Sequence, residues 1–73
     1  MSISYNKLWK LLIDRKMNKQ DLRTAAGIST SVIAKLGKSE NVTTDILLKI
    51  CKTLDCDISD IMEIERQTVN NEI

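Results

Sequence analysis

The chain has 73 residues, which is enough for one domain and too little for two. It contains 11 basic and 10 acidic residues, for a net charge of +1, and neither histidine nor proline. No stretch approaches the ~18 apolar residues that cross a bilayer, and the N-terminal residues lack the apolar run of a signal peptide. We therefore expect a cytoplasmic protein with no membrane partner.

The reactive side chains argue against an enzyme. The sequence has no histidine, no glycine-rich phosphate loop, and no serine or cysteine beside an evident base. Cys51 and Cys56 are too few for a secreted disulfide framework and lack the histidines of an ordinary zinc site, so we expect reduced, buried thiols. The sequence thus predicts no catalytic residue, no metal, no cofactor and no small-molecule effector.

Basic and acidic residues divide unevenly along the chain. Residues 1–38 contain eight basic and two acidic residues, whereas residues 39–73 contain three basic and eight acidic residues. The first half therefore carries +6 and the second half −5. A basic half favours a polyanion as partner, and a charged surface that only faces solvent is the alternative interpretation.

Helical spacing and capping residues predict an all-α domain, in which the first helix spans about 5–16. Its expected inward face consists of Tyr5, Leu8, Trp9 and Leu12, widened by Leu11 and Ile13. A second helix follows the N-cap residue Asn18, with Asp21 three positions later, and ends at Ala26. We expect Gly27 to close it in the left-handed conformation.

Ser29 is a typical N-cap for a third helix over about 30–36, which we expect Gly37 to stop. Two short helices joined by a turn that contains glycine are the outline of a helix-turn-helix, and Gly27 provides that glycine. The outward face of the third helix is small, polar and basic, with Thr30, Ser31, Ala34, Lys35 and Lys38. No acidic residue lies between positions 21 and 40, so this face suits a DNA major groove about 12 Å wide.

Thr43 caps a fourth helix that has the strongest periodicity in the sequence, at Leu47, Ile50, Cys51 and Leu54. Asp57 and Asp60 predict the start of a short fifth helix that carries Ile58, Ile61 and Met62. The segments "SISY" and "MEIER" alternate apolar and polar residues, which leaves open a short two-stranded β-ribbon. Residues 1–64 are expected to form the domain and 65–73 a C-terminal tail, for which disorder is one interpretation.

Residues 18–62 resemble the Cro and lambda-type repressor helix-turn-helix family, also called the xenobiotic response element family. The matching positions are Leu22, Gly27, Ile28, Ser29, Ile33, Leu36, Thr43, Leu47, Ile50, Leu54, Ile58 and Ile61. The resemblance extends back through the first helix. It implies a compact five-helix domain, resembling lambda repressor, that binds double-stranded DNA and regulates transcription.

Three positions depart from the pattern of this family. The family usually has glutamine at the first position of the second helix, where this chain has Lys19. It also usually ends the third helix with a glutamate, then any residue, then a glycine. Here Gly37 stands at the glutamate position and Ser39 at the glycine position. We expect Lys19 to keep a phosphate contact as a point charge, while the path of the loop over 37–42 stays open.

The resemblance also implies which residues contact DNA. The base-reading positions fall on Thr30, Ser31 and Lys35, of which Lys35 is the strongest candidate because lysine commonly reaches guanine O6 and N7. The phosphate-binding positions fall on Asn18, Lys19, Ser29, Lys38 and Asn41. One domain reads a half-site, and a homodimer would place two recognition helices about 34 Å apart, which the sequence leaves open. The alternative is a protein-interaction module of the antitoxin or anti-repressor type, with the acidic second half as its surface.

Overall fold

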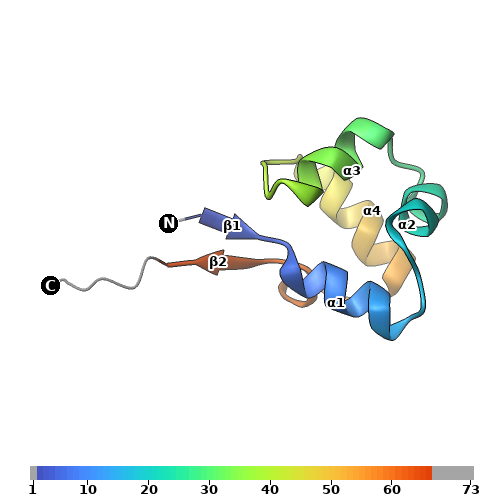
Figure 1. The fold of residues 1–73 in the computed structure, drawn as a ribbon, viewed down its shortest axis with the longest axis horizontal. Coiled ribbons are helices and arrows are strands. Elements are labelled where there is room, and N and C mark those ends of the chain that lie inside the picture. Colours follow the sequence, from blue (N-terminus) through green and yellow to red (C-terminus); the bar gives the residue numbers. More distant parts are fainter. Residues whose placement is uncertain (1, 67–73) are drawn as a thin grey trace, which may run out of the picture.

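Four α-helices, one 3-10 turn and a two-stranded ribbon form residues 2–66, the part that the computed structural model describes (Figure 1). In chain order the elements are β1 (Ser2–Ser4), α1 (Asn6–Asp14), α2 (Lys19–Ala26), α3 (Thr30–Gly37), α4 (Thr44–Leu54), η1 (Ile58–Asp60) and β2 (Glu63–Glu65). Four of the five predicted helices are therefore α-helices, and the fifth is a 3-10 turn of three residues that begins after Asp57 as predicted. Most of the predicted tail, 67–73, lies outside the described residues.

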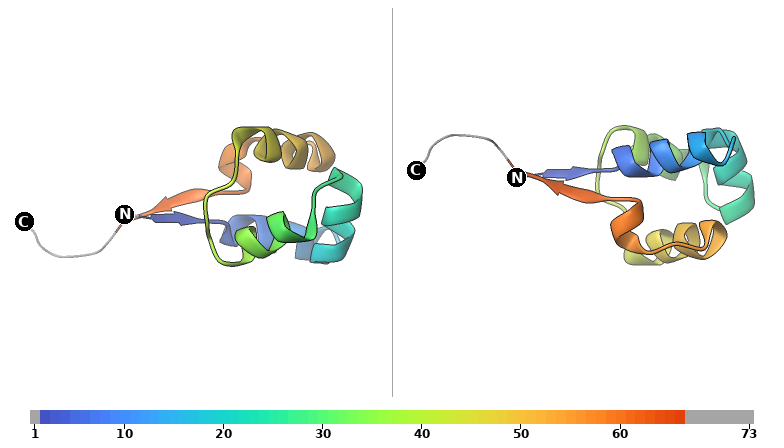
Figure 2. Two further views of the ribbon diagram at one scale, coloured as in Figure 1. Left: turned by 90° about the horizontal axis from the view of Figure 1, so that it is seen from above. Right: turned by 90° about the horizontal axis from the view of Figure 1, so that it is seen from below.

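The ribbon joins the two ends of the described chain. β1 and β2 pair antiparallel, and the central pair places Ile3 opposite Ile64. This confirms the ribbon that the alternating sequence left open. In both views of Figure 2 the ribbon extends to one side of the helices, away from α2. Ile64 is 55% exposed, so the pairing buries little apolar surface there.

Local capping fixes α2 as predicted. The side-chain oxygen of Asn18 accepts the backbone N–H of Asp21 at 2.8 Å, and the Asp21 carboxylate accepts the backbone N–H of Asn18 at 3.0 Å. These two bonds satisfy donors that the first turn of a helix leaves unpaired. At the other end Gly27 has a φ of 68°, which confirms the left-handed closure.

The first helix is shorter than the predicted 5–16. It ends at Asp14, and Lys16 adopts a left-handed conformation with a φ of 58°. The backbone N–H of Met17 then returns to the carbonyl of Leu12 at 2.8 Å. These closing bonds offset the strain of a non-glycine residue in this conformation. The helix therefore ends without a glycine that could have indicated its end in the sequence.

The core gathers residues from the ribbon junction, all four helices and the chain after η1. Its buried apolar members are Tyr5, Leu8, Leu12, Leu22, Ile28, Leu36, Leu47, Ile50, Cys51, Leu54 and Ile61. One predicted inward position is wrong, because Ile13 is 72% exposed. Ile13 follows the buried Leu12 directly, and one residue turns a helix by about 100°, away from the buried stripe. Trp9 is only half-buried.

The two free thiols predict a loss of stability in alkaline solution. Burial raises the pKa of Cys51 above its ordinary 9.0 and raises that of Cys56 to about 11. Both thiols are neutral in the folded and unfolded chains well below pH 9.0, so their contribution is fully present there. It is lost as the pH rises toward about 11, because the unfolded chain ionises first.

Denaturant unfolding on either side of this pH window measures the fall in stability. Burial also raises the pKa of Tyr5, so wild type alone does not isolate the thiols. We expect Cys56→Ser to show a shallower fall than wild type, since the serine hydroxyl does not ionise in this range. Equal slopes for the two proteins would contradict the assignment to Cys56.

Candidate nucleic-acid interface

The turn between α2 and α3 is held from both sides. Gly27 supplies the positive φ, and the next residue, Ile28, is 6% exposed and anchors the turn in the core. The backbone N–H of Ile28 donates to the carbonyl of Arg23 at 3.1 Å. On the other side the Ser29 hydroxyl accepts the N–H of Val32 at 3.3 Å, which confirms Ser29 as the N-cap of α3. The orientation of α3 relative to α2 is therefore fixed by packing and hydrogen bonds.

One face of α3 is buried and the other faces solvent. Leu36 is fully buried, and Val32 and Ile33 are half-buried beside it. The outward side chains are exposed as predicted: Thr30, Ser31, Ala34, Lys35 and Lys38. This face carries hydroxyl, methyl and ammonium groups and no carboxylate.

The hydroxyls of Ser29 and Ser31 lie 3.0 Å apart at the start of α3. One of the two hydroxyls donates its proton to the other, and the Ser29 oxygen also accepts the N–H of Val32. The second hydroxyl proton is left to donate outward, because each serine carries one donor and two acceptor positions. The two serines therefore act together rather than as separate contacts.

Lys35 and Asn41 meet at a cleft between α3 and the start of α4. The cleft has a volume of about 320 Å³. Its lining consists of Val32, Lys35, Asn41, Val42, Thr43 and Ile46. The sequence predicted Lys35 and Asn41 separately and missed Thr43 as a neighbour. Thr43 was assigned only its cap, which the structure confirms with a bond of 3.3 Å from the N–H of Ile46.

Lys19 lies at the other end of the predicted interface. Its ammonium nitrogen is 4.6 Å from the centre of the Trp9 ring and 3.6 Å from where a Cβ on Gly37 would stand. Asn18 is exposed beside it, with its side-chain oxygen used by the cap of α2. Trp9 was missed as a member of this group, because helical periodicity assigned both aromatics to the core.

The end of α3 differs from the prediction. Gly37 is the last helical residue and does not stop the helix, whereas Ser39 takes the left-handed conformation with a φ of 57°. The backbone N–H of Glu40 returns to the carbonyl of Lys35 at 2.9 Å, as in a Schellman closure. The Tyr5 hydroxyl then donates to the carbonyl of Glu40 at 3.1 Å and ties the loop to the core.

Ser39→Gly is expected to raise the free energy of unfolding by about 0.5–1 kcal/mol. Glycine removes the strain of a side chain at positive φ, and its greater freedom in the unfolded chain offsets part of that gain. Urea denaturation measures the change. Ser39→Ala keeps the strained Cβ and is the matched control, so equal stability of the two variants would contradict the prediction.

The cations of this region have no ion-pair partner in the described chain. Within residues 2–66 the only ion pair joins Asp45 and Lys49 of α4, at 3.7 Å. Lys19, Lys35 and Lys38 are exposed and therefore keep their charge available for an external anion.

A comparison with protein families identifies this arrangement. Residues 7–67 match the model of the Cro/C1-type HTH DNA-binding domain. The chain belongs to this family. The match confirms the resemblance seen in the sequence, and with it DNA binding through the helix-turn-helix and a function that is not enzymatic.

A solved structure is similar to this Cro/C1-type domain over most of its length. The crystal structure of transcriptional regulator VanUg, Form II, has a TM-score of 0.83 and 61% sequence identity, over 85% of this chain and 83% of that one. A comparison with curated proteins finds no match.

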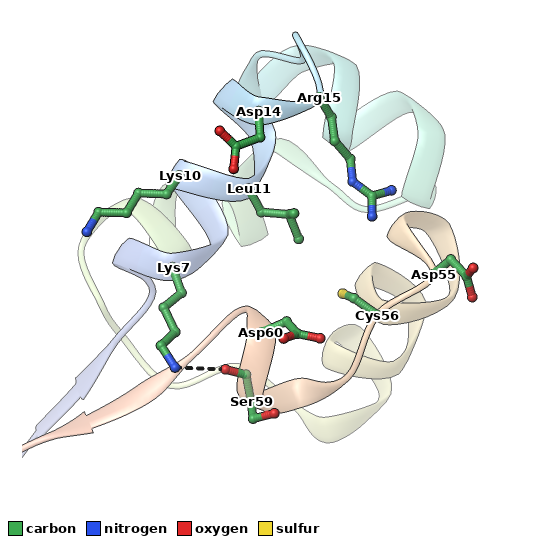
Figure 3. Close-up of a pocket in the computed structure, with 9 residues that line it drawn as sticks. All are labelled: Lys7, Lys10, Leu11, Asp14, Arg15, Asp55, Cys56, Ser59 and Asp60. Carbon is green, nitrogen blue, oxygen red and sulfur yellow. Dashed lines mark hydrogen bonds between the residues drawn. The ribbon is translucent and has the colours of Figure 1, made fainter.

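A further cleft of the Cro/C1-type domain lies between α1 and the segment around η1 (Figure 3). The Lys7 ammonium donates to the carbonyl of Ser59 across it at 3.1 Å. Cys56 lines the cleft, and its raised pKa keeps the thiol neutral at physiological pH. Residues 2–66 contain no group of three metal-binding side chains, and none of their helices has the length and apolar character of a membrane span.

Proposed function

We propose that this protein regulates transcription by binding selected sequences of duplex DNA, with α3 in the major groove. The observation that carries the proposal is the outward face of α3, which is exposed and polar, contains Lys35 and lacks a carboxylate. DNA binding by the family and the description of VanUg as a transcriptional regulator support it.

In this proposal Lys35 contacts a guanine, and Thr30 and Ser31 contact neighbouring base edges. The lysine ammonium donates to guanine O6 and N7, whereas a hydroxyl both donates and accepts and so discriminates less sharply. The bond between Ser29 and Ser31 limits the orientations of the Ser31 hydroxyl. Lys35 therefore contributes most of the base preference.

The proposed phosphate contacts flank these base-reading residues on both sides. They are Asn18, Lys19, Ser29, Lys38 and Asn41, all of which are exposed. Asn18 keeps its amide N–H groups for an external acceptor, since its oxygen is engaged in the cap. Asn41 shares a cleft with Lys35, so one DNA strand that enters this cleft meets a base-reading residue and a phosphate contact together.

Affinity for duplex DNA is expected to fall steeply with salt. Each phosphate that a cation neutralises contributes about −0.9 to the slope of log affinity against log salt, so Lys19 and Lys38 alone predict about −1.8 per domain. Fluorescence anisotropy with a labelled duplex measures the slope. A slope of zero on every duplex would contradict the proposal and favour a protein-interaction module.

Protein titrated into duplex at a concentration well above the dissociation constant counts the copies on each duplex. α3 has eight residues, and at about 1.5 Å per residue it spans only about 12 Å. This length fits one half-site, so we propose that two copies bind half-sites about 34 Å apart.

A further inference from the structure

We infer that the Trp9 ring holds the Lys19 ammonium in place for a phosphate of the DNA backbone and that Gly37 leaves the space beside it free, which makes Trp9 a positioning residue of the interface. This inference rests on the proposed function, because it names how one of the proposed phosphate contacts is arranged. The three residues come from α1, α2 and α3 and meet only in the folded domain.

The Trp9 ring fixes the ammonium without neutralising it. The nitrogen lies 4.6 Å from the ring centre, within the distance at which the negative face of an indole attracts a cation. The ring is half-buried on α1, and the same helix buries Leu8 and Leu12 in the core. A cation on this rigid support keeps its full charge, because the ring carries none.

Gly37 keeps a competing side chain away from the ammonium. A Cβ at this position would stand 3.6 Å from the Lys19 nitrogen, and Gly37 has no positive φ that would require glycine. Positions 19 and 37 are also two places where the sequence departs from the family pattern it resembles, and the structure shows that they are neighbours. A glutamate at position 37 would stand beside Lys19 and form an ion pair with it.

The ammonium remains accessible from outside. Lys19 is exposed, and with Asn18 and Trp9 it lines an open cleft of about 310 Å³. No carboxylate of residues 2–66 forms an ion pair with Lys19. A phosphate that approaches this cleft therefore meets a cation that is held in place and still charged.

The first test compares the salt dependence of DNA binding for wild type, Lys19→Gln and Lys19→Arg. We expect Lys19→Gln to make the log-log slope shallower by about 0.9, the contribution of one phosphate. Lys19→Arg should retain the slope, since arginine carries the same charge and stacks on aromatic rings. Lys52→Gln removes an exposed lysine of α4 outside the interface and is the matched control.

A double-mutant cycle separates positioning from ordinary packing. Trp9→Leu is expected to weaken binding by about 2- to 5-fold, and to cause no further loss in the Lys19→Gln background. Equal losses in both backgrounds would assign Trp9 to packing alone and overturn its positioning role. If Trp9→Leu does not fold by circular dichroism, Trp9→Phe replaces it in the same cycle with a weaker π face.

Gly37→Glu tests the other side of the arrangement. It should weaken binding more than Gly37→Ala does, and the difference should shrink when Lys19 is Gln, because the new carboxylate acts through that lysine. A difference of the same size in both backgrounds would overturn the role of Gly37. A wild type without salt dependence would refute the proposed function, whereas a slope that survives Lys19→Gln would refute only this inference.

Discussion

Leu36→Ala is expected to lower the free energy of unfolding by about 2–5 kcal/mol, because it leaves a cavity at a fully buried position. Leu36 is the one residue of α3 that is completely buried, so it attaches this helix to the core. Domains of this size rarely have more than about 3–5 kcal/mol of stability in total. Much of the variant should therefore be unfolded without denaturant.

Leu48→Ala provides the matched control for this change. It makes the same substitution on α4 at a position that is 60% exposed, so we expect its stability to lie within about 0.5 kcal/mol of wild type. Urea denaturation followed by circular dichroism at the helical band compares the two variants. Similar losses at positions 36 and 48 would contradict the role of Leu36 as the anchor of α3.

Lys35→Ala is expected to broaden the range of DNA sequences that the protein binds. A good bidentate contact to a base contributes about 1–3 kcal/mol of discrimination, or about 5- to 150-fold against the wrong base. Lys35 is exposed on α3, so its removal should disturb the fold little. Selection of duplexes from a random library, followed by sequencing, measures the preference at each position.

Lys38→Ala provides the comparison for base reading. Lys38 follows α3 directly and is a proposed phosphate contact, so its loss should weaken binding to all duplexes alike. The consensus selected by Lys38→Ala should match that of wild type. An unchanged consensus for Lys35→Ala would show that this lysine does not read a base.

Features set by neighbouring residues could be predicted from the sequence. The caps at Asn18, Ser29 and Thr43 each bond to a backbone N–H three positions later, so a single residue type in the right place indicates the helix start. Gly27 likewise indicates its own turn. The left-handed residues Lys16 and Ser39 carried no such signal, because hydrogen bonds around them, rather than residue type, stabilise that conformation.

The candidate site could be predicted only in part, for the same reason. The outward face of α3 follows from helical spacing alone, since residues on one helix share a face at fixed intervals. The meeting of Lys35 with Asn41, and of Lys19 with Trp9 and Gly37, depends on how separate elements pack. Helical periodicity predicts that Trp9 faces the core, but it gives no information about Lys19, which lies over the Trp9 ring in the folded domain.

The ribbon has a consequence for the order in which the domain folds. The turn between α2 and α3 forms from residues close in sequence, whereas β1 can pair with β2 only after nearly the whole described chain has closed into a loop. Closing such a loop costs conformational entropy, and a two-stranded ribbon is only marginally stable by itself. We therefore expect the helices to assemble first and the ribbon to form last, so that the two strands can separate while α3 keeps its place.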